Sequence, residues 1–474
     1  MDPHMDSPPN AVSESVVSPK NPDQNGESAS VLAATNQNQP STPNTEKPPV
    51  KNECCASSAA KKRKANVVVQ SRLKPTKFAY DSIITDPVVT GQNTVKDGTF
   101  FHYDDVPLNR RGYKYRICKP NRVLTATQYS TTELPPYNVR ASYFDKSQGV
   151  GCSEDMLSIT TQNGWLSARC NVAMREGKHY FEYDIINANN PDDKAHVRVG
   201  IGRKESALDA PVGFDGYGYG LRDLNGQKVT LSRPQEFMSE GFSSGDTIGF
   251  LVELPPLERQ RAGNVEFLKE FRNKHPKKSK LTQAAKEEED EEKKFNAFNN
   301  IHRDQIAIKY KNGLFFEQFE YTRTKQMDHL LNPVTVFGET AVLERNADAQ
   351  PTIPTIPESR IVVYKNGKCV GEMFNGIYSF LPLDLADDSA ATDANTKQQQ
   401  NPSYRNTDDG SLGYYPMMSV FSKGVVKINA GPDFKHPVPE GAIPLCERYD
   451  ESVVEEWLWD LVDEVEADYL DSFD

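Results

Sequence analysis

From about residue 99 onwards, short stretches of the chain alternate apolar and polar residues and are rich in Tyr, Val, Ile and Phe. Alternation with a period of two is typical of strands that bury one face, and Asn-Gly turn signals separate several of these stretches. Many short strands with almost no helical periodicity predict a mainly β fold, an antiparallel β-sandwich. The predicted strands lie at 99–103, 113–118, 164–170, 179–185, 196–202, 228–232, 246–254, 305–310, 360–366 and 425–430.

Two polar insertions interrupt this pattern. Residues 255–300 are highly charged and contain KEEEDEEKK, and residues 384–412 contain ATDANTKQQQNPS. Both are predicted to be long, mobile surface loops. The sandwich is therefore predicted to span residues 99–440 with these two insertions, and an acidic docking helix is predicted within 441–474.

The pattern changes from period two to helical spacing in SVVEEWLWDLVDEVE at 452–466. Ser452 and Glu455 fit the S-x-x-E capping box that marks a helix start. One face of this helix carries an apolar stripe roughly 140° wide at ~100° per residue. A helix of about fifteen residues is marginal alone in water, so the stripe either packs on its own sandwich or docks in a groove of another chain, which the acidic terminal position favours. The apolar stripe comprises Val454, Trp457, Leu458, Leu461, Val462 and Val465.

The net charge of −12 is spread unevenly along the chain. Residues 447–474 contain twelve acids and one base, whereas residues 54–80 contain seven bases and no acid. Residues 1–65 are rich in Pro, Ser, Asn, Gln and Thr and are predicted to be a disordered tail, followed by a basic linker at 66–98 that leads into the fold. The basic run within the tail is open to three interpretations: a nuclear import signal, an arm that contacts phosphates of nucleosomal DNA, or a solvated charge run. It comprises Lys61, Lys62, Arg63 and Lys64.

Other sequence features narrow the class of protein. No apolar run approaches the length of a membrane-spanning helix, so no membrane span is expected, and the N-terminal segment lacks the basic start and apolar stretch of a secretory signal. The seven cysteines form no C-x-x-C pair, which indicates free thiols in a reducing compartment and no zinc or other metal site. We therefore expect a cytosolic or nuclear protein without a cofactor.

Six segments of the predicted sandwich resemble, in order, the strands of SPRY domains. The most distinctive is GFDGYGYGLR, a Gly-rich aromatic segment that lies between strands and is therefore not a nucleotide-binding fingerprint. Any one of these motifs is common, but six in order across 155–437 are specific to the family. The segments lie at 177–185, 196–203, 213–222, 244–254, 362–374 and 414–437.

The acidic helix directly after these segments narrows the resemblance further. Together with the ending NAGPDFKHP, it resembles the absent-small-or-homeotic-discs family and its yeast counterpart, the brefeldin-A-sensitivity (Bre-type) subunit. The resemblance implies a nuclear, non-catalytic scaffold and regulatory subunit of COMPASS, the complex whose SET-domain subunit methylates histone H3 on lysine 4, and implies that the subunit stimulates this methylation. Animal relatives carry a zinc-finger module, for which this chain lacks the cysteines, and this departure points to the yeast-like form.

The resemblance also implies two binding sites. The C-terminal helix would dock into a groove of a Dpy-thirty-type small dimer through Leu458, Val462 and Val465. A basic pocket on the sandwich would hold an acidic segment of a WD-repeat subunit, since guanidinium groups bind carboxylates in a bidentate manner. From the residues alone, Arg198 and Arg222 could instead pair with local acids such as Asp215 or Asp223. The matching pocket positions are Trp165, Arg169, Arg198, Pro211, Phe214, where the family usually has tyrosine, and Arg222.

A catalytic site is not expected. Glu182 and Asp184 share one face of a predicted strand, but nothing in the sequence opposes them as a glycosidase requires. Two alternatives to the COMPASS interpretation stay open: a β-sandwich lectin or glycosidase, and a SPRY-type substrate receptor of a ubiquitin ligase, against which the missing RING, B-box or SOCS-box segment argues. We expect a protein that acts by binding other proteins, with no small-molecule substrate.

Overall fold

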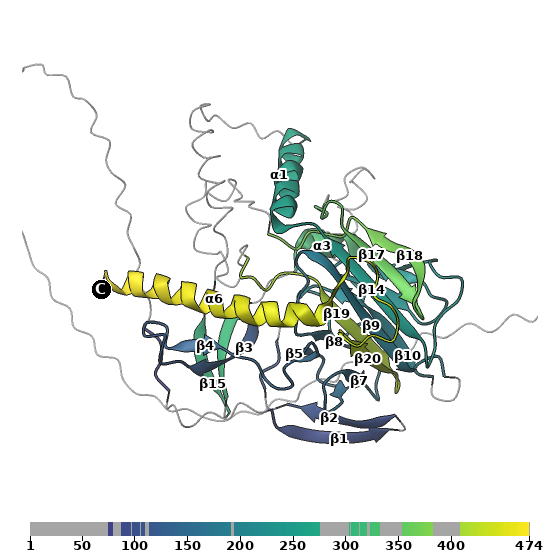
Figure 1. The fold of residues 1–474 in the computed structure, drawn as a ribbon, viewed down its shortest axis with the longest axis horizontal. Coiled ribbons are helices and arrows are strands. Elements are labelled where there is room, and N and C mark those ends of the chain that lie inside the picture. Colours follow the sequence, from purple (N-terminus) through teal and green to yellow (C-terminus); the bar gives the residue numbers. More distant parts are fainter. Residues whose placement is uncertain are drawn as a thin grey trace, which may run out of the picture. The chain divides into compact units, whose positions relative to one another are not determined.

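The chain folds mainly as antiparallel β-sheets, as the alternating pattern predicted (Figure 1). All ten predicted strands are present, within two residues of their predicted bounds at each end. In this computed structural model, the described residues all belong to one unit of the chain, Val68–Asp474. They are residues 74–78, 87–95, 97–104, 106–109, 113–190, 194–274, 303, 305–311, 313–319, 323–331, 353–382 and 408–473.

Several predictions fall outside the described residues. These are the disordered tail at 1–65 with its basic run at 61–64, and the parts of the two insertions at 275–300 and 384–407. The basic linker predicted at 66–98 is described in part, and its end forms the strand β1 (Val89–Val95) at the edge of a sheet.

The largest sheet holds ten strands and runs through the long central strand β9. All its pairings are antiparallel except that of β21 with β9. In sheet order its strands are β1, β2 (Gly98–Tyr103), β6 (Gly151–Cys152), β7 (Ser158–Thr160), β20 (Val425–Asn429), β9 (Gly177–Asn187), β14 (Thr247–Leu254), β17 (Arg360–Lys365) and β18 (Lys368–Asn375), with β21 (Ile443–Pro444) beside β9.

Two smaller sheets complete the β structure. The second has seven strands in the order β13 (Arg233–Gln235), β12 (Lys228–Thr230), β11 (Gly218–Arg222), β10 (His196–Gly202), β19 (Tyr415–Phe421), β8 (Leu166–Cys170) and β5 (Ala141–Lys146). The third has four strands in the order β15 (Ile306–Tyr310), β16 (Gly313–Phe319), β3 (Tyr113–Pro120) and β4 (Tyr129–Thr131).

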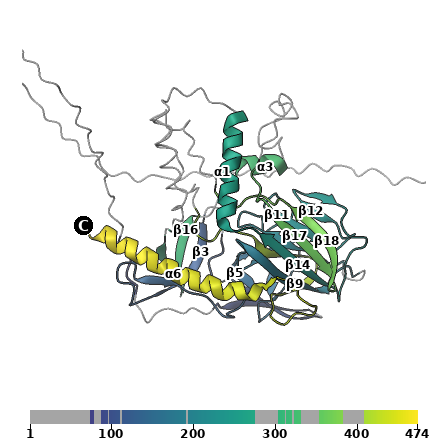
Figure 2. The ribbon, with the colours of Figure 1, turned by 45° about the horizontal axis from the view of Figure 1, so that its top comes forward.

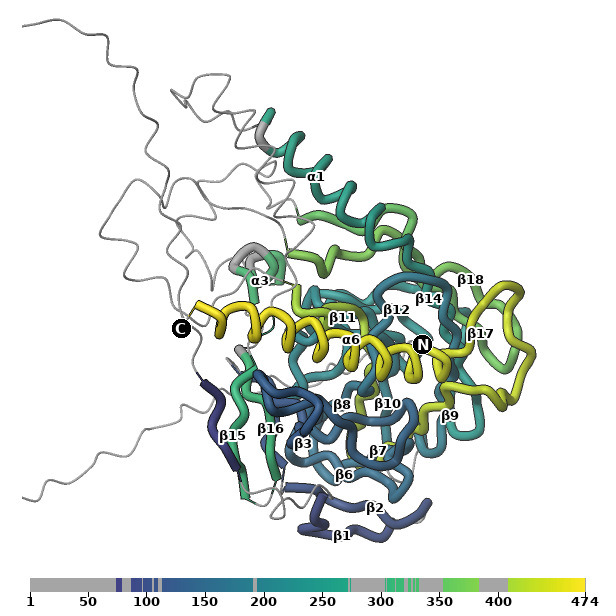
Figure 3. Tube along the Cα trace, turned by 60° about the vertical axis from the view of Figure 1, so that its left-hand side comes forward, coloured from purple at the N-terminus to yellow at the C-terminus, as the bar shows by residue number. Residues whose placement is uncertain are grey.

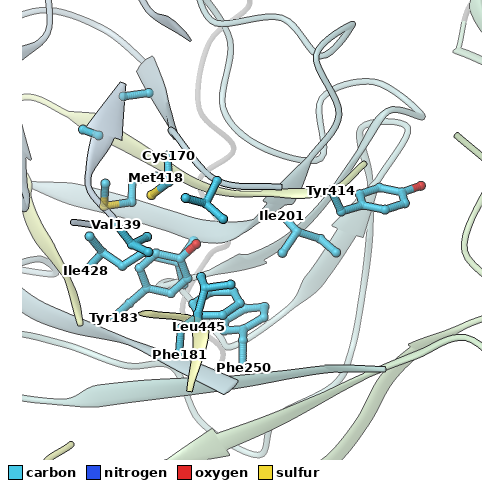
Figure 4. Close-up of a cluster of buried hydrophobic side chains, with 14 of the residues drawn as sticks. Val139, Cys170, Phe181, Tyr183, Ile201, Phe250, Tyr414, Met418, Ile428 and Leu445 are labelled. Atoms are coloured by element: carbon cyan, nitrogen blue, oxygen red, sulfur yellow. The ribbon is translucent and has the colours of Figure 1, made fainter. Parts of the chain in front are cut away.

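The main core lies between the two larger sheets, which makes them a sandwich (Figure 4). The Tyr183 hydroxyl of β9 donates to the Gly200 carbonyl of β10 at 2.6 Å and so links one sheet to the other. Burial of each large apolar side chain contributes about 1.5–3 kcal/mol to folding. Side chains that are 0% exposed come from both sheets: Phe181, Tyr183, Phe250 and Ile428 from the first, and Cys170, Ile201 and Met418 from the second.

The first insertion begins with a helix, α1 (Leu257–Lys274), where the sequence predicted a loop (Figure 2). Its residues are mostly good helix formers. The segment was predicted to be a loop because it is highly charged and its apolar residues show only weak helical periodicity. Gln260 and Asn264 fix its first half, because they are buried and donate to the carbonyls of Arg175 and Leu381.

The end of the second insertion is buried as well, although a surface loop was predicted there. Asp408 pairs with Arg175 at 2.6 Å, and Asp409 pairs with Lys114. Both aspartates are buried. Their partners come from distant parts of the chain, so no local pattern reveals the burial.

The C-terminal helix α6 spans Leu445–Asp471, so it begins seven residues before the predicted capping box. Leu445 is fully buried in the main core, and the Cys446 N–H donates to the Ala430 carbonyl at 2.9 Å, which fixes the first turn. Ser452 donates to the Tyr449 carbonyl instead of capping the helix. A short helix, α3 (Lys325–Leu331), lies near β11 and β12. None of the described helices has the length and apolar character needed to cross a membrane.

Candidate functional site

Two arginines face each other on the second sheet. Arg198 of β10 and Arg222 of β11 stand directly opposite in the antiparallel register. Like charges at such positions repel each other. Burial, followed by the charge of Arg222, lowers the pKa of Arg198 to about 10. A negatively charged ligand would relieve this repulsion.

The hydrogen bonds of the two guanidinium groups leave their charges uncompensated. Arg198 donates through Nη1 to the Val212 carbonyl at 3.2 Å, while its buried Nε has no partner among the described residues. Arg222 donates through Nη1 to Gln227 Oε1 at 2.7 Å. Both acceptors are neutral, so neither charge is balanced by an ion pair within the described residues.

The nearby aspartates are engaged elsewhere. Asp215 is 2% exposed and pairs with Arg323 at 2.5 Å. Asp223 is 3% exposed and pairs with His196 at 2.9 Å. Neither aspartate forms an ion pair with Arg198 or Arg222 among the described residues, and the charge of Asp223 only partly offsets the lowering of the Arg198 pKa.

Aromatic side chains border the arginine pair. The Arg198 guanidinium lies 5.2 Å from the centre of the Trp165 ring, within the range of a cation–π interaction. Trp165 also contacts Phe421 at 5.5 Å between ring centres, and Phe421 contacts His196 at 6.2 Å. Phe421 and His196 were not singled out from the sequence, although they are direct cross-strand partners whose alternation places them on the Arg198 face.

The loop before β11 forms the remaining edge of this surface. Pro211 and Phe214 belong to one turn, in which the Phe214 N–H donates to the Pro211 carbonyl at 3.0 Å. The Phe214 ring is 41% exposed. Val212 in the same turn accepts from Arg198, which joins the loop to the arginine pair. We call the set Trp165, Arg198, Pro211, Phe214 and Arg222 the arginine surface.

Arg169 does not belong to this surface. It is 1% exposed, and Nη1 donates to the carbonyls of Arg203 and Ser206 at 3.1 and 2.8 Å. Its Nη2 pairs with Asp145 at 3.2 Å. Arg169 therefore holds the loop after β10 in place, and its charge is already compensated.

A segment after the first insertion supports the loop of the arginine surface. The Thr324 N–H donates to the Tyr217 hydroxyl at 2.7 Å, and Arg323 binds Asp215. Met327 of α3 is 2% exposed, and its sulfur would lie 2.3 Å from a Cβ placed on Gly216. No local pattern in the sequence reveals this support, because the two segments are far apart along the chain.

The apolar stripe of α6 lies on the surface. Leu461 is partly buried, and the other five members are exposed. Tyr469 and Phe473 extend the exposed row towards the C-terminus, with ring centres 5.0 Å apart. A continuous row of this kind is typical of a docking site. The exposed fractions are 57% for Val454, 40% for Trp457, 55% for Leu458, 49% for Val462 and 70% for Val465.

Glu182 and Asp184, the carboxylates considered for a glycosidase, form hydrogen bonds and an ion pair within the fold. Glu182 is 0% exposed and accepts from the Tyr180 hydroxyl at 3.1 Å and from the Lys435 N–H at 3.2 Å. Asp184 accepts from the Thr247 hydroxyl and pairs with the Lys435 ammonium at 2.8 Å. Within the described ranges, no group of three or more His, Cys, Asp or Glu side chains is arranged to hold a metal ion.

Comparison with known proteins identifies the family of this chain. No protein-family model matches it. The Schizosaccharomyces pombe "Set1 complex component ash2" is 36% identical over 77% of this chain and 47% of its own length. The Colletotrichum higginsianum "COMPASS component cclA" is 32% identical over 77% of this chain and 68% of its own length. The chain belongs to this family of COMPASS components.

The resemblance to the absent-small-or-homeotic-discs and Bre-type family is thereby confirmed. The Saccharomyces cerevisiae "COMPASS component BRE2" is 28% identical over 77% of this chain and 89% of its own length. The chain spans about half the length of the S. pombe relative. A solved human SPRY domain aligns with 60% of the chain at 13% identity and a TM-score of 0.27.

Proposed function

We propose that this COMPASS-family protein is a nuclear, non-catalytic scaffold and regulatory subunit of a SET-domain histone H3 lysine-4 methyltransferase. It acts by holding partner subunits. The observation that carries the proposal is the apolar stripe of α6, because five large side chains stand exposed in one row. Exposed apolar rows rimmed by polar residues mark protein–protein docking sites.

The partner proposed for the stripe is a Dpy-thirty-type small dimer with an apolar groove. The stripe offers Leu458, Val462 and Val465 at spacings of four and three residues, which is the anchor pattern of a helix bound in a groove. Each anchor that becomes fully buried contributes about 1.5–3 kcal/mol. Three to five anchors support micromolar or tighter binding after the costs of association.

The partner proposed for the arginine surface is an acidic segment of a WD-repeat subunit. Two cationic groups without a described carboxylate partner favour such a ligand. Arginine binds carboxylates through short, charge-assisted hydrogen bonds, and the rings of Trp165 and Phe214 offer apolar contact beside them. Arg169 takes no part in this binding, since its guanidinium is occupied inside the fold.

These two contacts give the subunit its regulatory effect. By binding the small dimer and the WD-repeat subunit together, the protein favours the active conformation of the SET domain. The conformational equilibrium of the SET domain shifts in this way if the assembled partners bind its active conformation more tightly than its inactive one. The basic run at 61–64 stays a separate prediction, either of nuclear import or of contact with nucleosomal DNA.

The test is a tagged full-length chain used as bait in nuclear extract, with captured proteins identified by mass spectrometry. A SET-domain methyltransferase, WD-repeat proteins and a small dimeric subunit are expected. The purified chain is then added to the other subunits, and histone H3 lysine-4 methylation is expected to rise. Capture of ubiquitin-ligase subunits or glycoproteins in their place, or no change in methylation, would reject the proposal.

A further inference from the structure

Helix α6 turns its charged face, not its apolar face, towards the rest of the protein. At ~100° per residue, Glu456, Asp460 and Glu464 lie on the side opposite to Leu458 and Val465. Most surface helices bury their apolar face and expose their charges. Here Asp460 is 2% exposed, while Val465 is 70% exposed. We call Glu456, Asp460, Asp463 and Glu464 the acidic face.

The first anchor of the acidic face is Glu464, which binds the turn before β4. Its carboxylate accepts from the N–H groups of Thr125, Ala126 and Thr127 at 2.6, 2.7 and 2.7 Å. The hydroxyls of both threonines donate to it as well. Three successive N–H groups make a ready site for an anion. Burial would raise the pKa of Glu464, but these hydrogen bonds outweigh it and hold the pKa below its usual value.

The second anchor is Arg303, which follows the first insertion. Its side chain is 1% exposed. Nη2 lies 3.2 Å from Asp460 and 3.3 Å from Glu456, and Nε lies 3.2 Å from Asp463. One cation thus holds three carboxylates from successive turns of α6. This arrangement explains why acids can crowd one side of the helix without repelling it from the protein.

The sheet beneath α6 supplies further donors. Thr131 of β4 donates to Asp460 from its N–H at 2.8 Å and from its hydroxyl at 3.1 Å. Arg116 of β3 pairs with Glu456. Both donors belong to the third sheet, beside which α6 runs (Figure 3). The attachment is therefore polar from Glu456 to Glu464.

We propose that the acidic face is a mount that fixes α6 to the third sheet and presents the apolar stripe as a preformed ligand. This inference rests on the proposed function, in which the stripe docks into a partner groove. A free helix would have to be ordered and oriented on binding, and that loss of freedom weakens affinity. A mount made of charges also decides which face is presented, because it holds the acidic side against the sheet and leaves the apolar stripe exposed.

Hydrogen exchange of the full-length chain without any partner tests the mount directly. Glu464→Ala and Arg303→Met each remove one anchor, and Glu466→Ala is the matched control, because Glu466 is an exposed acid of the same helix. Loss of several charge-assisted hydrogen bonds predicts exchange at least about tenfold faster in residues 456–467 for the first two variants. Amides of β9 should stay protected in all three. Exchange equal to that of the unmodified chain would overturn the mount.

The affinity for the small dimer tests the second half of the inference. Glu464→Ala and Arg303→Met should each weaken binding about tenfold, with a less favourable binding entropy in calorimetry, and Glu466→Ala should not. Faster exchange with unchanged affinity would overturn the claim that the mount preforms the ligand. Failure of the unmodified chain to bind the dimer would instead reject the proposed function, and the exchange experiment would still decide whether the mount exists.

Discussion

Arg198 and Arg222 face each other across β10 and β11, and no described carboxylate neutralises either of them. A fold that kept two arginines in this position for stability alone would place an acid between them. The pKa of Arg198 is lowered first by burial and then by the charge of Arg222, so both effects destabilise the charged form of Arg198. This uncompensated pair supports the proposal that an anionic partner binds here, at some expense in stability.

Replacing both Arg198 and Arg222 should weaken binding of an acidic peptide while the protein still folds. Arg198→Ala with Arg222→Ala is expected to weaken binding of an acidic peptide at least about 100-fold, since hydrogen bonds to charged groups contribute about 1.5–3 kcal/mol each. The remaining affinity should depend less on salt, because two charges are gone. Fluorescence anisotropy with a labelled Asp- and Glu-rich peptide, at several salt concentrations, measures both effects.

The control for that experiment is Arg360→Ala, which removes a half-exposed arginine of β17 on the other large sheet. It should leave the dissociation constant of the peptide unchanged. An unchanged dissociation constant for the double variant would reject the arginine surface as the peptide site. Thermal unfolding of the double variant checks that the chain still folds after the Arg198 hydrogen bond to Val212 and the contact with Trp165 are lost.

The sequence predicted strands well, because alternation along a strand reports local burial. The family resemblance included Arg169 in the pocket, and the alternation agrees with an outward position, because Ala168 and Cys170 point into the core. That outer face is covered by the loop after β10, whose Arg203 and Ser206 carbonyls accept from Arg169. The cover depends on contacts between separate segments of the chain, and no local pattern reports it.

Helix α6 also has features that a local sequence pattern could not predict. The apolar stripe could be predicted from spacing alone, and the structure exposes it. The start at Leu445 could not, because it depends on burial of that side chain between distant strands. The attachment of the acidic face could not be predicted either, because Arg303 reaches it from a distant part of the chain. Ion pairs between residues that are far apart along the chain cannot be predicted from the spacing of apolar and polar residues.

Charge placed on the stripe should abolish docking without harming the fold. Leu458 and Val462 are 55% and 49% exposed, so glutamate at either position adds little cost to folding. Leu458→Glu with Val462→Glu is expected to prevent co-elution of the small dimer in size-exclusion chromatography, because each carboxylate would be buried without a partner in an apolar groove. Val438→Glu, at an exposed apolar residue outside α6, is the control and should keep co-elution. Retained co-elution of the double variant would show that the dimer binds elsewhere.

The α3 segment should tune the arginine surface through the loop that carries Phe214. Met327→Ala would leave a cavity beside Gly216 and free the turn that Asp215 holds. The affinity for the acidic peptide is expected to fall about fivefold, while the dependence of affinity on salt stays the same, because no charge is lost. Anisotropy measures both quantities. A changed salt dependence, or an unchanged affinity, would show that α3 does not position the loop.

Burial raises the pKa of two carboxyl groups of the acidic face, Asp460 and Asp463, so the charge of each opposes folding at neutral pH. Burial raises the pKa of Asp463 to about 6, Arg303 offsets part of this rise, and Asp460, Glu466 and Glu456 add to it. The folded protein therefore binds a proton at Asp463 more tightly than the unfolded chain does. The charged form destabilises the fold fully above about pH 6, and the penalty fades as the pH falls towards the ordinary aspartate value of about 3.9.

Removing that charge should therefore stabilise the protein in a pH-dependent way. Asp463→Asn should raise the free energy of unfolding at pH 7.5 by about 1–2 kcal/mol, and this gain should shrink to about a third of that value at about pH 4.5. Urea unfolding at both pH values measures the difference, with Asp468→Asn as the exposed control. A variant less stable than the unmodified chain at the higher pH would mean that the pairing of Asp463 with Arg303 outweighs burial. Asp463 would then be a third anchor of the mount beside Glu464 and Arg303.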